Sequence, residues 1–249
     1  AITSAGMLVG SATSGDMTVD GVVAASSNTV GGTVTLAATQ ALKKVTFATA
    51  SSTFNALAVQ ARNGVILSTN MFTDTGSLYL DGDSDDTAEA TAATDGMVVI
   101  TGKTISSATV LTLEAGSASV TGQGTLTLMA TAGIVLEDSV TTAGALVMSA
   151  GSGAGSVVTV RATETVSSTG TAVTITAYDI DLAGDLNAGT GAVVLIDTAG
   201  SIGLGGTSAN MHVSGAEMGA ITSAGLLVVS ATSGDMTVDG VVAASSNTV

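Results

Sequence analysis

Short runs in which apolar residues alternate with small polar residues recur along the chain and constrain its fold more than any other feature. Residues 33–36, 124–128 and 172–176 are examples, and such runs stop at Gly, Ser, Asp or Asn. A period of two is typical of a strand with one buried face, and the frequent Val, Ile and Thr favour strands over helices. No stretch of the sequence has the apolar spacing of an amphipathic helix. The pattern therefore predicts an all-β protein.

The spacing of the runs favours one all-β architecture. Leu36, Leu57 and Leu78 are 21 residues apart, and Val45 and Val65 are 20 apart. This spacing predicts a parallel β-solenoid, or β-helix, of about 20 residues per coil, in which neighbouring coils stack about 4.8 Å apart. A sandwich or an up-and-down barrel lacks such a period and usually has aromatic core residues, whereas aromatic residues make up only 2% of this chain. A period of 219 residues would then hold about 11 coils and rise about 50 Å.

That period of 219 residues comes from a duplication at the two ends of the chain. Residues 1–30 and 220–249 are the same sequence except at two positions, where Met7 and Gly10 are replaced by Leu226 and Val229. Long-range self-similarity of this kind is typical of repeat architectures. We therefore expect residues 1–219 to be one full period of a β-solenoid array and residues 220–249 to be the start of the next period. The chain is expected to be a section of a longer tandem array.

Composition excludes several classes of function. The chain has 20 acidic residues against five Lys and Arg, which gives a formal net charge of −15 and argues against nucleic acid as a partner. It has no Cys, so disulfide scaffolds, thiolate catalysis and Cys-based metal sites are excluded. The longest apolar stretch, around residues 192–196, is far too short to span a membrane, and no membrane insertion is expected.

Two long runs resemble a known class of surface proteins. They are GTLTLMATAGIVLEDSVTTAGALVMSAG (124–151) and VTITAYDIDLAGDLNAGTGAVVLIDTAGSIGLGG (173–206). Their repeat style is similar to that of filamentous-haemagglutinin-like and giant tandem-repeat β-solenoid surface proteins, and the resemblance extends over essentially the whole chain. It implies an extended right-handed β-helix that is secreted or displayed on cells and serves as a fibre or an adhesin. No functional residue is transferred, because these families have no motif of that kind.

One acidic segment is a candidate metal site. Asp81, Asp83, Asp85 and Asp86 place four carboxylates within six residues, and oxygen-rich clusters suit Ca²⁺. The spacing is not that of an EF-hand loop, and a solvated acidic loop is the simpler interpretation. Segment 81–95 is also the longest one without an alternating apolar run, so it is the expected outward excursion of the solenoid.

Other candidate chemistry is weaker. Asp179, Asp181 and Asp185 alternate with apolar residues and are expected on the outer face of a strand. The glycines of residues 96–104 have the wrong spacing for a phosphate-binding loop, and His212 is not accompanied by a nucleophile elbow. We therefore expect no enzyme activity and no cofactor, apart from the calcium alternative.

The sequence thus favours a structural function. We expect a non-catalytic repeat segment of a long extracellular or cell-surface fibre, whose partner is the chain itself, by end-to-end continuation and by lateral association. The alternative is an adhesin or binding module that displays loops such as 81–95 on a solenoid stalk. Thr-x-Thr pairs at 33/35, 125/127 and 174/176 also raise the less favoured alternative of an ice-binding solenoid.

Overall fold

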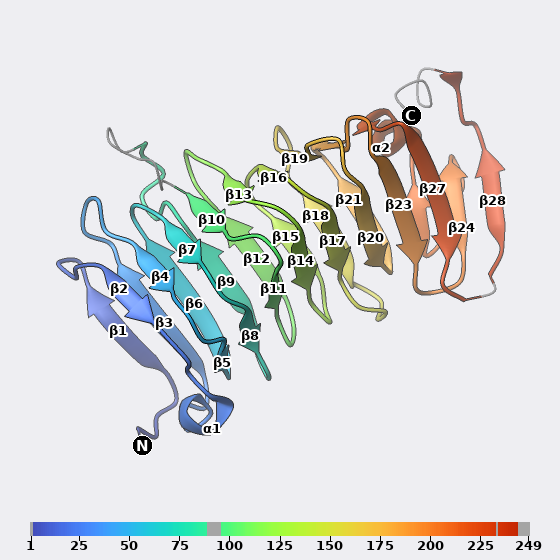
Figure 1. Ribbon diagram of the computed structural model, residues 1–249. Helices are drawn as coiled ribbons and strands as arrows, with labels where there is room; N and C mark the ends of the chain where they lie inside the picture. The colour runs from blue at the N-terminus through green and yellow to red at the C-terminus, as the bar shows by residue number, and fades with distance from the viewer. Residues whose placement is uncertain (1, 89–95, 233, 244–249) are drawn as a thin grey trace.

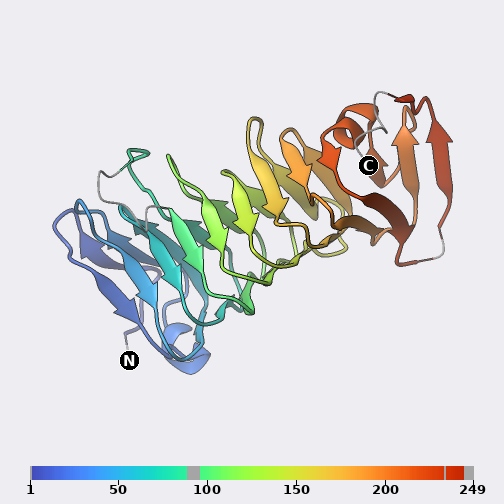
Figure 2. The same ribbon diagram turned by 45° about the horizontal axis from the view of Figure 1, so that its top comes forward.

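The chain forms an elongated stack of parallel strands, as the prediction of a parallel β-solenoid requires (Figure 1). The computed structural model describes residues 2–88, 96–232 and 234–243. Among these residues the only helices are two short ones, α1 (Ala24–Ser27) and α2 (Gly215–Gly219). Figure 2 shows the same stack from a second direction, with the two ends of the chain at opposite ends of the molecule.

Three sheets run the length of the stack, and every strand pairing between named strands is parallel. Sheet 1 consists, in spatial order, of β1 (Met7–Ser11), β3 (Thr33–Ala38), β6 (Ala56–Ala61), β9 (Leu78–Asp81), β12 (Leu111–Glu114), β15 (Ile134–Leu136), β18 (Val157–Val160) and β21 (Asp179–Leu182). Sheet 2 consists of β2 (Met17–Val19), β4 (Val45–Phe47), β7 (Val65–Leu67), β10 (Met97–Val99), β13 (Val120–Gly122), β16 (Val140–Thr142), β19 (Thr165–Ser168), β22 (Asp185–Asn187) and β26 (Ile221–Thr222).

The third sheet closes each coil. Sheet 3 consists of β5 (Ser52–Phe54), β8 (Met71–Thr73), β11 (Lys103–Ser106), β14 (Leu126–Met129), β17 (Leu146–Ser149), β20 (Val173–Ala177), β23 (Ala192–Asp197) and β27 (Gly225–Ser230). From β3 to β23 the chain visits sheets 1, 2 and 3 in turn and then starts the next coil, so each coil is a triangle of three short strands.

The C-terminal end departs from this regular path. After β23 the chain forms sheet 4, in which β24 (Ile202–Gly205) lies between β25 (Met211–Val213) and β28 (Met236–Asp239). The backbone N–H of His212 in β25 donates a hydrogen bond to Asp179 in β21 at 2.9 Å, so sheet 4 lies beside the last strand of sheet 1. Sheet 4 therefore occupies the place that the next strand of sheet 1 would take.

Coil length varies more than the sequence pattern predicts. Val45 pairs with Val65, as expected, but Leu36 pairs with Val59 rather than with Leu57. Coils of 20 residues also occur between Val120 and Val140, whereas Leu78 pairs with Leu111, 33 residues later. The predicted 11 coils are therefore too many: sheet 1 holds eight strands. The corners of the solenoid absorb insertions, because a longer loop between two strands leaves their hydrogen bonding unchanged.

Alternating side chains fill the inside of the triangle. In sheet 1 the register partners Leu57, Leu78, Leu111 and Ile134 stack above one another, and each is at most 1% exposed. Burying one such side chain stabilises the fold by about 1.5–3 kcal/mol. Because successive coils share one continuous core, each coil depends on its neighbours for stability.

Candidate functional site: an acidic corner of the solenoid

The predicted acidic segment lies at the corner where sheet 1 leads into sheet 2. Asp81 is the last residue of β9, and the chain does not enter sheet 2 again until Met97. Residues 81–88 of the predicted outward excursion are described, and residues 89–95 lie outside the described residues. The described part brings the predicted aspartates close to carboxylates from later coils, which sequence reasoning missed: Glu114, Glu137 and Asp138. We call this group the acidic corner.

Asp81 and Glu114 are direct neighbours on adjacent strands. They are register partners of β9 and β12, and Asp81 is only 5% exposed. Burial, together with the repulsion from Glu114, raises the pKa of Asp81 to about 7. Tyr79 donates a hydrogen bond to Glu114, and burial and this bond raise the pKa of Tyr79 above its usual range. The side chain of Asp81 is therefore ready to take up a proton near neutral pH.

Asp83 is fully buried, and its carboxylate organises the turn. It accepts hydrogen bonds from the backbone N–H of Ser117 at 2.9 Å and from its hydroxyl at 2.5 Å. Its other oxygen accepts one from the backbone N–H of Thr87 at 3.4 Å. Asp83 thus ties the loop after β9 to the loop after β12, which is a structural role.

The other two predicted aspartates face outward. Asp85 forms an ion pair with Arg62 at 2.9 Å, and both side chains are about one-third exposed. Asp86 borders a shallow hollow of about 350 Å³ together with Glu114, Glu137 and Asp138. Asp138 accepts hydrogen bonds from the backbone N–H groups of Ala115 and Gly116, and burial raises its pKa.

The four predicted aspartates therefore do not converge on one point. Asp81 and Asp83 accept hydrogen bonds inside the corner, Asp85 pairs with Arg62, and Asp86 borders the hollow. Within the described residues, no group of three or more His, Cys, Asp or Glu side chains is placed to hold a metal ion. Calcium binding at this corner stays a prediction.

The second acidic group is divided between two environments. Asp181 and Asp185 are exposed on the outer face, as expected. Asp179 instead accepts hydrogen bonds from the backbone N–H groups of Ile180 and His212, and burial raises its pKa. The imidazole Nε2 of His212 lies 2.9 Å from the carbonyl oxygen of Gly205, so this ring is held in sheet 4.

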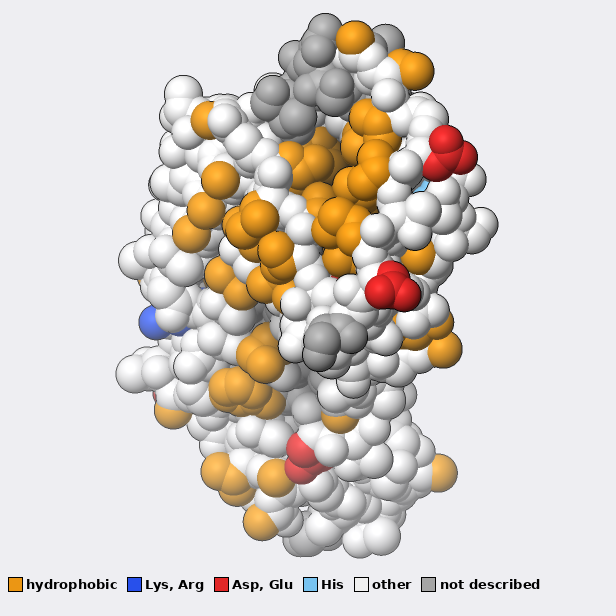
Figure 3. Space-filling model, turned by 90° about the vertical axis from the view of Figure 1, so that its right-hand side faces the viewer, with side chains coloured by type: hydrophobic (Ala, Val, Ile, Leu, Met, Phe, Trp, Pro, Cys, Tyr) orange, Lys and Arg blue, Asp and Glu red, His pale blue; other side chains and the backbone are white. Residues whose placement is uncertain are grey.

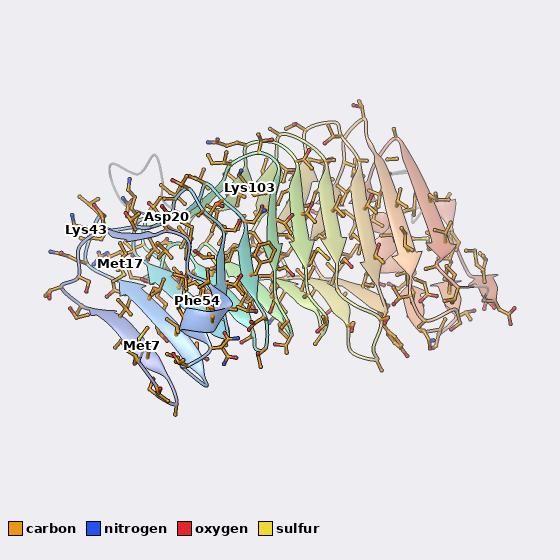
Figure 4. The ribbon with its side chains drawn as sticks, turned by 60° about the horizontal axis from the view of Figure 1, so that its bottom comes forward. Met7, Met17, Asp20, Lys43, Phe54 and Lys103 are labelled. Atoms are coloured by element: carbon orange, nitrogen blue, oxygen red, sulfur yellow. The ribbon has the colours of Figure 1, made fainter. Side chains whose placement is uncertain are left out.

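The two ends of the stack are the other prominent surfaces. At the N-terminal end, Met7, Val9, Val30 and Phe54 border a hollow of about 430 Å³ that opens onto the core (Figure 4). At the C-terminal end, apolar side chains gather on the end face (Figure 3), where Met236 is 48% exposed and Val238 is 59% exposed. Both ends therefore present core-type side chains to solvent.

In the part of the chain that the structure describes, no helix has the length and apolarity to cross a membrane. Comparisons of the chain with protein-family models, with curated proteins and with solved structures find no match. The arrangement of the strands and of the ends is therefore the basis for assigning a function.

Proposed function

We propose that the chain is a non-catalytic structural segment of a long extracellular or cell-surface fibre built from stacked β-solenoid coils. The observation that carries this proposal is the pair of open ends: each terminal coil has unpaired strand edges and exposed core-type side chains. Such edges favour continuation of the sheet by another chain or by another repeat. The resemblance in repeat style to filamentous-haemagglutinin-like surface proteins is the support for the location.

The mechanism is mechanical. Three sheets of parallel hydrogen bonds run along the axis, so tension along the fibre is shared by many short strands at each level. The outer surface carries most of the chain's charge, and a net charge of −15 keeps neighbouring fibres soluble and apart.

A matched pair of substitutions tests this proposal. Val238 points toward the core side of β28 but is uncovered, whereas Thr237 is its outward neighbour. We expect the 249-residue chain to associate end to end in sedimentation velocity experiments as its concentration rises. Val238→Lys should abolish this association, because docking would bury an unpaired charge, and Thr237→Lys should not. A wild-type chain that stays monomeric at high concentration would contradict the proposal.

A binding module is the second candidate, and the hollow of the acidic corner is the observation that favours it. A cationic group on a partner would fit this surface. The double variant Asp86→Asn and Glu114→Gln should then lose attachment to cells, while Asp181→Asn with Asp185→Asn, which removes the same charge elsewhere, should retain it. Equal attachment by both variants would exclude this candidate.

The ice-binding alternative receives no support from the register. It needs Thr at one position in every coil, but on sheet 3 Thr127 pairs with Val147, which pairs with Thr174 and then with Val194. On sheet 1, Thr35 pairs with Ala58. The described faces therefore lack a continuous Thr array.

A further inference from the structure

The duplicated sequence occurs at both ends of the stack, and each copy shows a different neighbour. In the first copy, β1 pairs with β3, with Met7 opposite Val34. In the second copy, the same residues form β27, which pairs with β23, with Leu226 opposite Val193. Within the described residues each of these two strands has one partner and one free edge. The structure therefore contains both halves of the environment of a single strand.

The two copies present the same side chains to the core. Met7 and Val9 face inward in β1, and their counterparts Leu226 and Val228 pack against the core in β27. Leu8 and its counterpart Leu227 point outward and are 65% and 52% exposed. Because the inward face is unchanged, one strand can pair with both neighbours at once.

We infer that the C-terminal end is the docking surface for a second copy of this repeat. In the docked arrangement, the second copy's β3 pairs with β27, and its β4 pairs with β28. The register is the one that β1 and β2 already show, with Met7 opposite Val34 and Met17 opposite Val45. This inference rests on the proposed function and names the partner and the register of its end-to-end contact.

Unused hydrogen-bonding groups at the C-terminal end fit this arrangement. In the first copy, Asp16 accepts a hydrogen bond from the backbone N–H of Lys44, and Asp20 accepts two, from Thr49 and Ala50. The counterparts Asp235 and Asp239 make no such bonds within the described chain. Docking of a second copy supplies the same three N–H groups.

Apolar side chains at the same end tell the same story. Met17 and Val19 pack against the core beneath the coil that follows them. Their counterparts Met236 and Val238 are 48% and 59% exposed, because the described chain has no coil above them. At the other end, the hollow beside Met7 and Val9 is the place where a preceding repeat's Val193 and Leu195 would lie, as those residues do opposite Leu226 and Val228.

The docked repeat is turned by one face. The first copy places its main strand, β1, in sheet 1, whereas the second copy places the same strand, β27, in sheet 3. Sheet 3 of one repeat therefore continues as sheet 1 of the next, and sheet 4 continues as sheet 2. The step from β1 to β27 is about eight and two-thirds coils, which is a rise of about 42 Å at the strand spacing of about 4.8 Å. Three repeats bring a strand back to its original face.

Cross-linking in a two-repeat chain tests the inference. The chain is extended after Val249 by a second copy of residues 31–249, and the natural sequence supplies no competing Cys. Leu227→Cys is combined with Thr35→Cys in the second repeat, since Leu8, the counterpart of Leu227, is the register partner of Thr35. We expect a short bifunctional thiol reagent to join the two in most molecules, because paired strands lie about 4.8 Å apart. Mass spectrometry of proteolytic fragments identifies the product.

A second pair of cysteines distinguishes the turned arrangement from an unturned one. If every repeat began on the same face, the second repeat's β3 would lie over β28, and Thr237→Cys would react with the second repeat's Thr35→Cys instead. That result would overturn the inference and leave the stacked fibre intact. Absence of both products in a folded chain would overturn the fibre as well. Val194→Cys with Leu227→Cys is the positive control, because these residues are register partners in the chain as it stands.

Discussion

At the scale of single residues, two very different environments lie one position apart. Leu111 is fully buried between Leu78 and Ile134, whereas the next residue, Thr112, points outward. This alternation is what the sequence pattern predicted. Asp81 departs from it, because it ends a strand and is buried at a corner beside another carboxylate.

The raised pKa of Asp81 makes stability depend on pH. The folded chain holds the proton up to about pH 7, whereas an unfolded chain releases it near pH 4. Stability should therefore rise as the pH falls from above 7 to about 4, and the ionised carboxylate destabilises the fold above pH 7. We expect Asp81→Asn to stabilise the chain at pH 8 by about 1–4 kcal/mol and to flatten this pH dependence.

Urea unfolding of the wild type and the variant between pH 4 and pH 8 measures this effect. Asp185→Asn removes a carboxylate from an exposed strand position and is the matched control, for which we expect no change. A wild-type chain that becomes less stable between pH 7 and pH 5, or an Asp81→Asn variant that loses stability at pH 8, would contradict the explanation.

At the scale of strands and coils, the sequence predicted the parts of the fold that depend on local pattern. The alternation identified strands, and the pairing of Val45 with Val65 was correct because a 20-residue coil separates them. The pairing of Leu36 was wrong by two residues, since an extra stretch of chain between the strands shifts the register without changing the alternation. The capping box of α2, in which Ser214 and Glu217 bond to each other's backbone N–H groups, was also missed.

The acidic corner shows the same limit. The four predicted aspartates are close in sequence and could be found there. Glu114 reaches Asp81 only because Leu78 pairs with Leu111 across a 33-residue coil, and no local pattern predicts that length. Asp83 could be recognised as acidic but not as a buried clamp, because its partner Ser117 belongs to the following coil.

Core packing within one coil gives a prediction at this scale. Leu111→Ala should lower the free energy of unfolding by about 2–5 kcal/mol, because the cavity lies between two coils that cannot close over it independently. Thr112→Ala, on the outer face of the same strand, should change it by less than about 1 kcal/mol. Urea unfolding followed by circular dichroism measures both. Equal losses for the two variants would mean that the register of β12 is wrong.

At the scale of the whole molecule, two opposing forces decide how repeats associate. The uncovered core at each end favours docking, since apolar side chains such as Met236 and Val238 would leave water. The net charge of −15 on every chain opposes it, because docking brings like charges together. The fibre is thus held by its ends and kept separate from its neighbours by its sides.

This balance predicts that salt strengthens end-to-end association. Raising the ionic strength from 0.01 M to 1 M shortens the screening length from about 30 Å to about 3 Å, which removes most of the repulsion and leaves apolar docking intact. We expect the dissociation constant from sedimentation equilibrium to fall at least several-fold over this range, and NaCl and MgCl₂ at matched ionic strength should act alike. CaCl₂ with a much larger effect, lost on Asp86→Asn with Glu114→Gln, would show specific bridging at the acidic corner. Association that weakens with salt would instead mean that ion pairs hold the ends together.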